Sequence, residues 1–297
     1  MATYENQTLQ DQRALGWPIV VFFVLAYAIA WGAFGILSVI ARNSGVESTQ
    51  TFMAMAESFE FDEVHLSVAP WLVYLLTRLA DFAFSIAGVV MIAATAGRGG
   101  LRQLWRRLTR WRIGWGWYAL GLLPIGLYLL ATAVANAFFS ANFTVSTITT
   151  ALFSLYAGFF VSLFLRGALG EELGLRGFAL PYLQAHMSPF RASLLIGVLW
   201  GAWHLPVLIG RDLLSVVAFS VLSIGLAMLF TLLFNGSGGS LIPVLLFHAS
   251  QNWEEGFETL FPSLVGTEWE LISTLSLLVI GVVAGVMVWR NGRTPPL

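Results

Sequence analysis

The sequence of 297 residues contains no cysteine and no lysine, and only 10% of its residues are charged. Without cysteine the chain forms neither a disulfide framework nor a thiolate metal site. All fifteen basic residues are arginine, and the formal net charge of −1 argues against a nucleic-acid partner. Hydrophobic residues make up 58% of the chain, and the mean hydropathy is +0.79. These values exclude an ordinary soluble domain and indicate a polytopic membrane protein.

Long apolar segments predict an all-α fold with about eight transmembrane helices. The first apolar run continues from Trp17 to Ile40, so we expect an uncleaved membrane helix and not a signal peptide. The predicted spans are 17–41, 70–96, 115–139, 149–182, 190–210, 213–234, 241–257 and 271–289. A short amphipathic helix is expected within 42–69. We expect residues 1–297 to form one integral membrane domain, with a catalytic core at 150–256.

The arginines are distributed unevenly between the two predicted sides of the membrane. If the N-terminus is inside, two arginines fall in outer segments, Arg42 and Arg211, and ten fall in inner ones. The inner set is Arg13, Arg98, Arg102, Arg106, Arg107, Arg110, Arg112, Arg191, Arg290 and Arg293. Cytoplasmic loops carry such an excess of positive charge. We therefore expect both termini in the cytoplasm, acidic loops outside, and a location in the plasma membrane.

The segment 98–112 interleaves six of these arginines with tryptophans. Basic residues mixed with aromatic ones also occur in nucleic-acid-binding proteins. Between two predicted spans, we interpret the segment as a cytoplasmic loop that rests on anionic lipid headgroups.

Charged residues inside two predicted spans require an explanation, because each costs about 2.5–3.5 kcal/mol at a helix centre. Arg78 and Asp81 are three residues apart, and we interpret them as a structural pair. Glu172 and Arg176 are four residues apart on one helix face, so they also can pair. Glu171 is rotated by about 100° from its neighbour and has no obvious local partner. Taken alone, this motif is also compatible with an ordinary charge pair at the membrane interface.

Two histidines and an asparagine in later spans complete a candidate site. His248 and Asn252 are one turn apart and share a face. At about 1.5 Å per residue, Glu171, His204 and His248 on three neighbouring helices can meet in one layer if the helix of Glu171 continues past Arg176. Each residue alone has a structural explanation, such as a helix–helix hydrogen bond. Together they suit hydrolysis, because a carboxylate can deprotonate water, a histidine can orient it, and an amide can donate to an oxyanion.

Three motifs in this order resemble those of the CPBP family of intramembrane proteases. This family of CAAX proteases and bacteriocin-processing enzymes includes the type II CAAX prenyl endopeptidases. The motifs are Glu171-Glu172-x-x-x-Arg176, Trp200-x-x-x-His204 and His248-x-x-x-Asn252. The resemblance covers 152–253, and Trp200 stands where the family usually has Phe. It implies that Glu172 and Arg176 form a structural pair.

The resemblance also implies a role for each of the other residues. Glu171 would be the base and His204 its partner in activating water, while His248 and Asn252 would line the oxyanion site. The implied reaction is cleavage of a peptide bond in a membrane-associated or lipidated protein, reached from the cytoplasmic side.

A metal-free mechanism is favoured because asparagine is an uncommon zinc ligand and the other groups have hydrolytic roles without a metal. The alternative is a zinc ion held by Glu171, His204 and His248.

Two other functions remain open from the sequence. The first is a non-catalytic membrane immunity or scaffold protein of the same family, against which the presence of the full motif set argues. The second is a small transporter that uses the polar cluster as an ion site. The sequence lacks the paired Gly- or Pro-broken helices in two halves that are typical of many transporters.

Overall fold

The structure is a computed structural model that describes residues 16–58, 61, 65–66, 68–127, 130, 158–165, 167–252, 279 and 281–290. Every regular element within these ranges is helical, which confirms the all-α prediction. In chain order the first elements are α2 (Trp17–Asn43), α3 (Thr49–Ser58), α4 (Pro70–Asp81), α5 (Ala83–Leu108) and α6 (Trp115–Gly121). They are followed by α9 (Gly167–Gly174), the π-helix η1 (Leu175–Ala179), α10 (Leu180–Gln184), α11 (Pro189–Trp203), the 3₁₀-helix η2 (Leu205–Leu208), α12 (Leu213–Gly236) and α13 (Ile242–Gln251).

Three of the described helices are long and apolar enough to cross a membrane, namely α2, α5 and α12. A shorter apolar helix covers Gly281–Arg290. The predicted spans 115–139, 149–182, 241–257 and 271–289 fall partly outside the described residues. The predicted number of eight spans is therefore not confirmed. The three long apolar helices do confirm that the chain is a membrane protein.

The helices of the N-terminal half differ from the predicted ones at two positions, a break at Phe82 and a kink at Gly97. The predicted helix 70–96 is interrupted at Phe82, where α4 ends and α5 begins. α5 then continues to Leu108 through a kink at Gly97, whose φ of 56° and ψ of −148° are readily adopted only by glycine. The segment 98–108, predicted as a loop, is consequently helical, and arginine is a good helix former. The predicted amphipathic helix within 42–69 is confirmed by α3.

The helix that carries the glutamates continues past Arg176, as the alignment of the site residues required. α9, η1 and α10 follow one another without a break as far as Gln184, with a single π-turn between them. The predicted helix 190–210 instead ends at Trp203, and η2 follows it. Pro206 explains this end, because proline lacks the N–H that an α-helix would need there.

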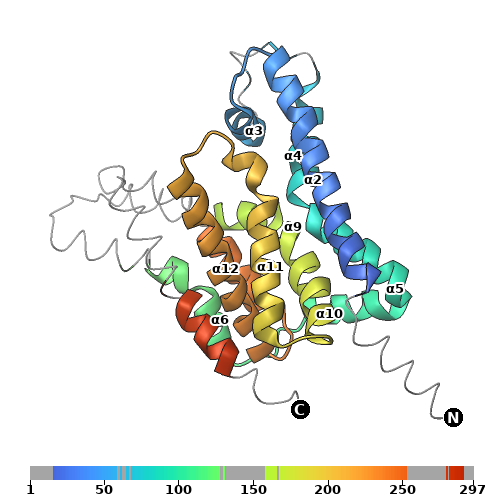
Figure 1. Cartoon of the computed structure of the whole chain (residues 1–297), viewed down its shortest axis with the longest axis vertical. Helices are drawn as coiled ribbons and strands as arrows, with labels where there is room; N and C mark the ends of the chain where they lie inside the picture. Colours follow the sequence, from blue (N-terminus) through green and yellow to red (C-terminus); the bar gives the residue numbers. More distant parts are fainter. Residues whose placement is uncertain are drawn as a thin grey trace.

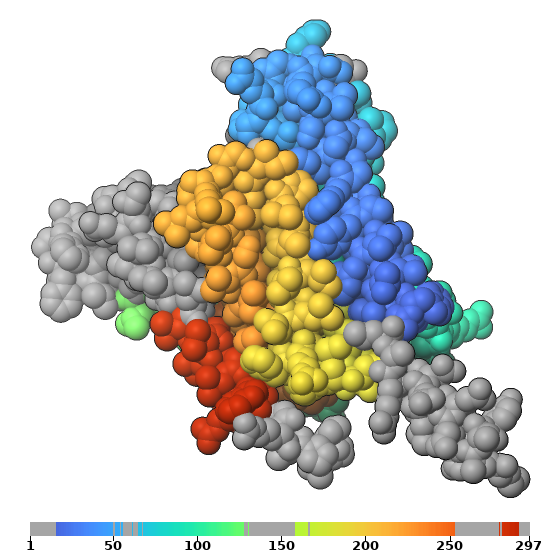
Figure 2. All heavy atoms as spheres, in the orientation of Figure 1, coloured from blue at the N-terminus to red at the C-terminus, as the bar shows by residue number. Residues whose placement is uncertain are grey.

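Close helix packing places α9 at the centre of the fold. Gly170 and Gly174 face the junction of α4 and α5, where an added Cβ would overlap the carbonyls of Asp81 and Phe84. A Cβ at Gly88 would lie 2.6 Å from the Cα of Gly174. Small residues at such positions let helix backbones approach closely. α11 and α12 lie side by side against this centre (Figure 1), and α2 projects beyond their ends (Figure 2).

Candidate active site

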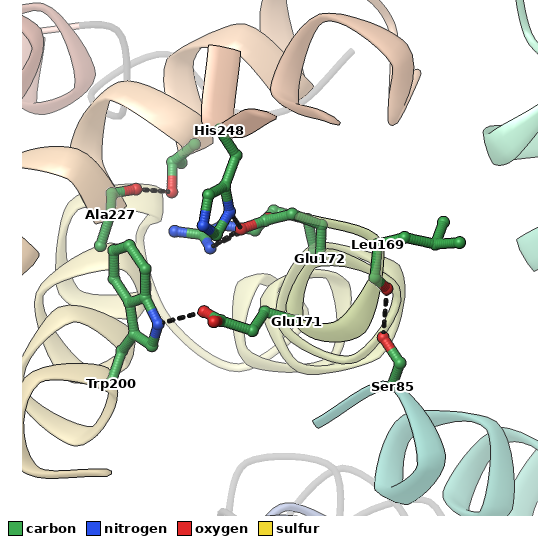
Figure 3. A network of polar contacts seen from close by, with 9 residues as sticks. Ser85, Leu169, Glu171, Glu172, Trp200, Ala227 and His248 are labelled. Carbon is green, nitrogen blue, oxygen red and sulfur yellow. Dashed lines mark hydrogen bonds and ion pairs between the residues drawn. The ribbon is translucent and has the colours of Figure 1, made fainter. Parts of the chain in front are cut away.

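The glycines and the glutamates of α9 lie on different faces of the helix. Residues four apart share a face of a helix. The face with Gly170 and Gly174 packs on α5, and the Ser85 hydroxyl donates to the Leu169 carbonyl at 2.7 Å (Figure 3). Both glutamates lie on the remaining surface and are buried, with exposed fractions of 5% for Glu171 and 0% for Glu172.

Glu171 is held by a tryptophan of α11. The Trp200 indole Nε1 donates to Oε2 of Glu171 at 2.5 Å (Figure 3). From the sequence, Trp200 was predicted only to be an aromatic variant of a family motif, and this contact was not predicted. The available signal was the indole N–H itself, because a buried tryptophan usually finds a hydrogen-bond acceptor. The phenylalanine that is usual in the family has no such donor.

Glu172 accepts hydrogen bonds from two residues. Nη1 of Arg176 lies 2.9 Å from Oε1 of Glu172 and 3.0 Å from Oε2, so the predicted pair is present. Nδ1 of His248 lies 2.8 Å from the same Oε1 (Figure 3). A carboxylate only accepts hydrogen bonds, so Nδ1 of His248 carries the proton in this bond. This second role of Glu172 was not predicted from the sequence.

The Arg176 guanidinium is fully buried between two aromatic rings. Its Cζ lies 4.7 Å from the ring centroid of Phe230 and 5.5 Å from that of Trp200. Such cation–π contacts stabilise a guanidinium that is removed from water. The ion pair with Glu172 and these two rings together hold the guanidinium in place.

Three polar atoms converge at the start of α9. A Cβ built on Gly167 would lie 2.7 Å from Oε1 of Glu171 and 3.3 Å from both Nδ2 of Asn252 and Nε2 of His248. A carboxylate oxygen, an amide nitrogen and an imidazole nitrogen therefore surround one small space. Gly167 borders this space and contributes no side chain to it. No role was predicted for this glycine from the sequence.

His204 lies beside the cluster at the end of α11. Its Nδ1 donates to the Trp200 carbonyl at 2.8 Å, which leaves the lone pair of the neutral ring on Nε2. The ring centroid is 5.8 Å from that of Trp200 and 4.9 Å from that of Phe219. Both His204 and Glu171 are described, and no hydrogen bond joins them directly. The two residues are linked through Trp200.

The side chains do not form the zinc set that the sequence allowed as an alternative. Among the described residues, no group of three His, Cys, Asp or Glu side chains is arranged so that it could hold a metal ion. Glu171, His204 and His248 are all described, and they do not form such a group in this arrangement.

Comparisons with known proteins agree with the resemblance that the motifs carry. Residues 153–253 match the family described as type II CAAX prenyl endopeptidase Rce1-like. Over 46 residues the chain is 48% identical to CAAX prenyl protease 2 of Methanococcus maripaludis, an alignment that covers 16% of this chain and 17% of that protein. The segment that matches the family, residues 153–253, contains the whole cluster from Gly167 to Asn252. Residues 153–253 are accordingly an Rce1-like segment of a membrane protein, which confirms the resemblance to CPBP-family proteases.

Proposed function

We propose that the chain is an intramembrane endopeptidase that hydrolyses a peptide bond of a membrane-associated or lipidated protein substrate. The observation that carries this proposal is the convergence of Glu171 Oε1, His248 Nε2 and Asn252 Nδ2 beside Gly167. These are a proton acceptor and two groups able to bind a carbonyl oxygen, which is the set that hydrolysis of an amide needs. The Rce1-like match over the same residues supports it.

In this mechanism Glu171 is the general base. A water molecule between Oε1 and the substrate gives its proton to Glu171, and its oxygen attacks the carbonyl carbon. The hydrogen bond from Trp200 to Oε2 supports this role, because it fixes one oxygen and leaves the other directed at the small space. His204 accepts a hydrogen bond from the same water through Nε2 and orients it.

The negative oxygen of the tetrahedral intermediate is bound by Asn252 and His248. Nδ2 of Asn252 donates directly. His248 donates from Nε2 in its imidazolium form, which the Glu172 carboxylate at Nδ1 stabilises. The carbonyl then re-forms as the C–N bond breaks, and the leaving nitrogen takes the proton held by Glu171. The step consumes one water and leaves the protein unchanged.

The proposal includes the placement of the site. Residues 1–297 form one integral membrane domain with a catalytic core at 150–256. Both termini lie in the cytoplasm of a cell whose plasma membrane holds the protein, and substrates enter from that side. The unequal distribution of arginines supports this orientation.

The test is a cleavage assay with purified full-length protein in detergent and two peptides, one farnesylated at a C-terminal cysteine and one unmodified apolar peptide. Glu171→Gln should lower the cleavage rate by about 10²–10⁴-fold, because it removes the base and keeps the shape. Glu47→Gln changes an exposed glutamate and is the matched control. Wild-type protein that binds a peptide and cleaves neither would favour the non-catalytic scaffold reading.

A further inference from the structure

The last turns of α5 and the segment after it form a basic pocket that catalysis does not use. The pocket has a volume of about 670 Å³. Ten described residues line it, of which none is acidic and four are arginines, namely Arg106, Arg107, Arg110 and Arg112. The whole chain has a net charge of −1, so this concentration of positive charge is local.

Two of the pocket's guanidinium groups are fixed by main-chain carbonyls. Nη1 of Arg107 donates to the Gly177 carbonyl at 2.7 Å, and Nη1 of Arg110 donates to the Gly238 carbonyl at 2.6 Å. The backbone of the same segment is also held, because the Leu241 N–H donates to the Arg107 carbonyl at 3.0 Å. Each anchored guanidinium keeps further N–H donors for a ligand. The pocket is thus already assembled before a ligand binds, which lowers the entropic cost of binding.

No acidic side chain among the described residues neutralises the charges in the pocket. Within the described part of the chain, none of the four arginines forms an ion pair. Arg106 and Arg112 are exposed, and the guanidinium of Arg112 lies 5.1 Å from the Trp111 ring. The planar fork of arginine matches the oxygens of a phosphate group. The ligand chemistry indicated is therefore a phosphoryl group.

Exposed tryptophans indicate where this phosphate comes from. Trp105 and Trp111 are each 63% exposed, and Trp115 is 85% exposed. Tryptophan rings gather at the level of lipid headgroups because they are both apolar and able to donate a hydrogen bond. α5, which leads into the pocket, is a candidate membrane span. The pocket therefore lies where a span ends, beside the layer of lipid phosphates.

We propose that the basic pocket binds the phosphate of an anionic phospholipid headgroup. This inference concerns a surface separate from the polar cluster and does not depend on the proposed peptidase activity. Its test measures binding alone, so a failure of one proposal leaves the other standing.

The experiment titrates full-length protein in neutral detergent with short-chain phosphatidylglycerol and counts bound lipid by native mass spectrometry. Short-chain phosphatidylcholine and inorganic phosphate are titrated in parallel. Each arginine close to an anionic lipid contributes about fivefold in affinity. The double variant Arg106→Gln/Arg112→Gln should therefore bind phosphatidylglycerol about 20–30-fold more weakly than wild type. Arg102→Gln, an exposed arginine of the same helix outside the pocket, should bind within about twofold of wild type.

Several outcomes would overturn the proposal. They are equal binding of the two lipids by wild type, an unchanged affinity in the double variant, or an equal loss in Arg102→Gln, which would indicate diffuse charge. Inorganic phosphate that binds as tightly as phosphatidylglycerol would remove the lipid as ligand. If the double variant does not fold, Arg106→Gln alone should show a loss of about fivefold, and wild-type affinity there would refute the site.

Discussion

The Trp200 indole donates a 2.5 Å hydrogen bond to Glu171 and so joins α11 to α9 at the centre of the polar cluster. Trp200 also places its backbone carbonyl on Nδ1 of His204, and its ring centroid lies 5.7 Å from that of His248. One residue thus positions the proposed base and contacts both histidines. Glu171, His204 and His248 are each held by a hydrogen bond with a residue of α9 or α11.

Replacing Trp200 tests how the base is positioned. Trp200→Phe keeps an aromatic ring and removes one hydrogen bond to a charged acceptor, worth about 1.5–3 kcal/mol. If the bond orients Glu171, kcat should fall by about tenfold or more while KM changes little. Steady-state kinetics on the cleaved peptide measure this. A variant with the wild-type kcat would show that the indole N–H has no part in orienting the carboxylate.

The space beside Gly167 can be filled by one methyl group. In Gly167→Ala the new Cβ would lie 2.7 Å from Oε1 of Glu171, so the carboxylate must move. Because that atom is the end of a side chain, we expect the melting temperature to change little and the cleavage rate to fall by about 10²-fold or more. Gly35→Ala, in α2 where nothing lies within 4 Å of the added Cβ, is the matched control. Normal cleavage by Gly167→Ala would mean that reaction does not occur in this space.

The buried pair of Glu172 and Arg176 should contribute mainly to stability. Arg176→Ala leaves a fully buried carboxylate without its cation, which typically costs about 3–5 kcal/mol. We expect low yield and a lower melting temperature in detergent, whereas Arg191→Ala at an exposed position should melt as wild type does.

A second variant separates packing from chemistry at this pair. Arg176→Met/Glu172→Leu replaces both charges by apolar side chains and should recover much of the lost stability. It should remain inactive, because Nδ1 of His248 loses its acceptor. Recovery of activity together with stability would show that Glu172 does not assist His248.

The local chemistry of the sequence predicted the parts of this arrangement that depend on residues close together in the chain. The Arg78–Asp81 ion pair, with Nη2 and Oδ2 3.0 Å apart, was predicted from i,i+3 spacing. The Glu172–Arg176 pair was predicted from i,i+4 spacing. The long-range contacts were not predictable in this way, because Trp200 is 29 residues from Glu171 and His248 is 76 residues from Glu172. Helix periodicity specifies which face a side chain occupies and does not specify which face of another helix it meets.

The errors in the predicted elements have equally local causes. The kink at Gly97 has a positive φ, which glycine can adopt but also often does not adopt. The sequence alone therefore did not show whether the arginine segment after Gly97 is a loop or a continuation of the helix. The early end of α11 follows from Pro206, which hydropathy alone did not reveal because the apolar run continues beyond it.

Reporter fusions test the proposed orientation. Fusions after Arg110 and at the C-terminus should give a cytoplasmic signal, and a fusion at Glu47 should give an external one, because arginine-rich segments remain inside. Paired reporters that are active on opposite sides of the membrane measure this. An external signal after Arg110 would reverse the orientation, and with it the proposed cytoplasmic access of substrates.

Two substitutions of Asn252 test whether its side-chain amide is an oxyanion donor or a structural group. Its Nδ2 lies 3.3 Å from the Cβ position built on Gly167. Asn252→Ala removes the donor and should lower kcat by about 10²–10³-fold, the usual effect of losing one oxyanion donor. Asn252→Asp keeps the shape and places an acceptor where the donor was, so it should be at least as inactive as the alanine variant. A structural amide would give the opposite order, with Asn252→Asp close to wild type and Asn252→Ala impaired. Melting temperatures measured beside kcat separate a loss of folding from a loss of chemistry.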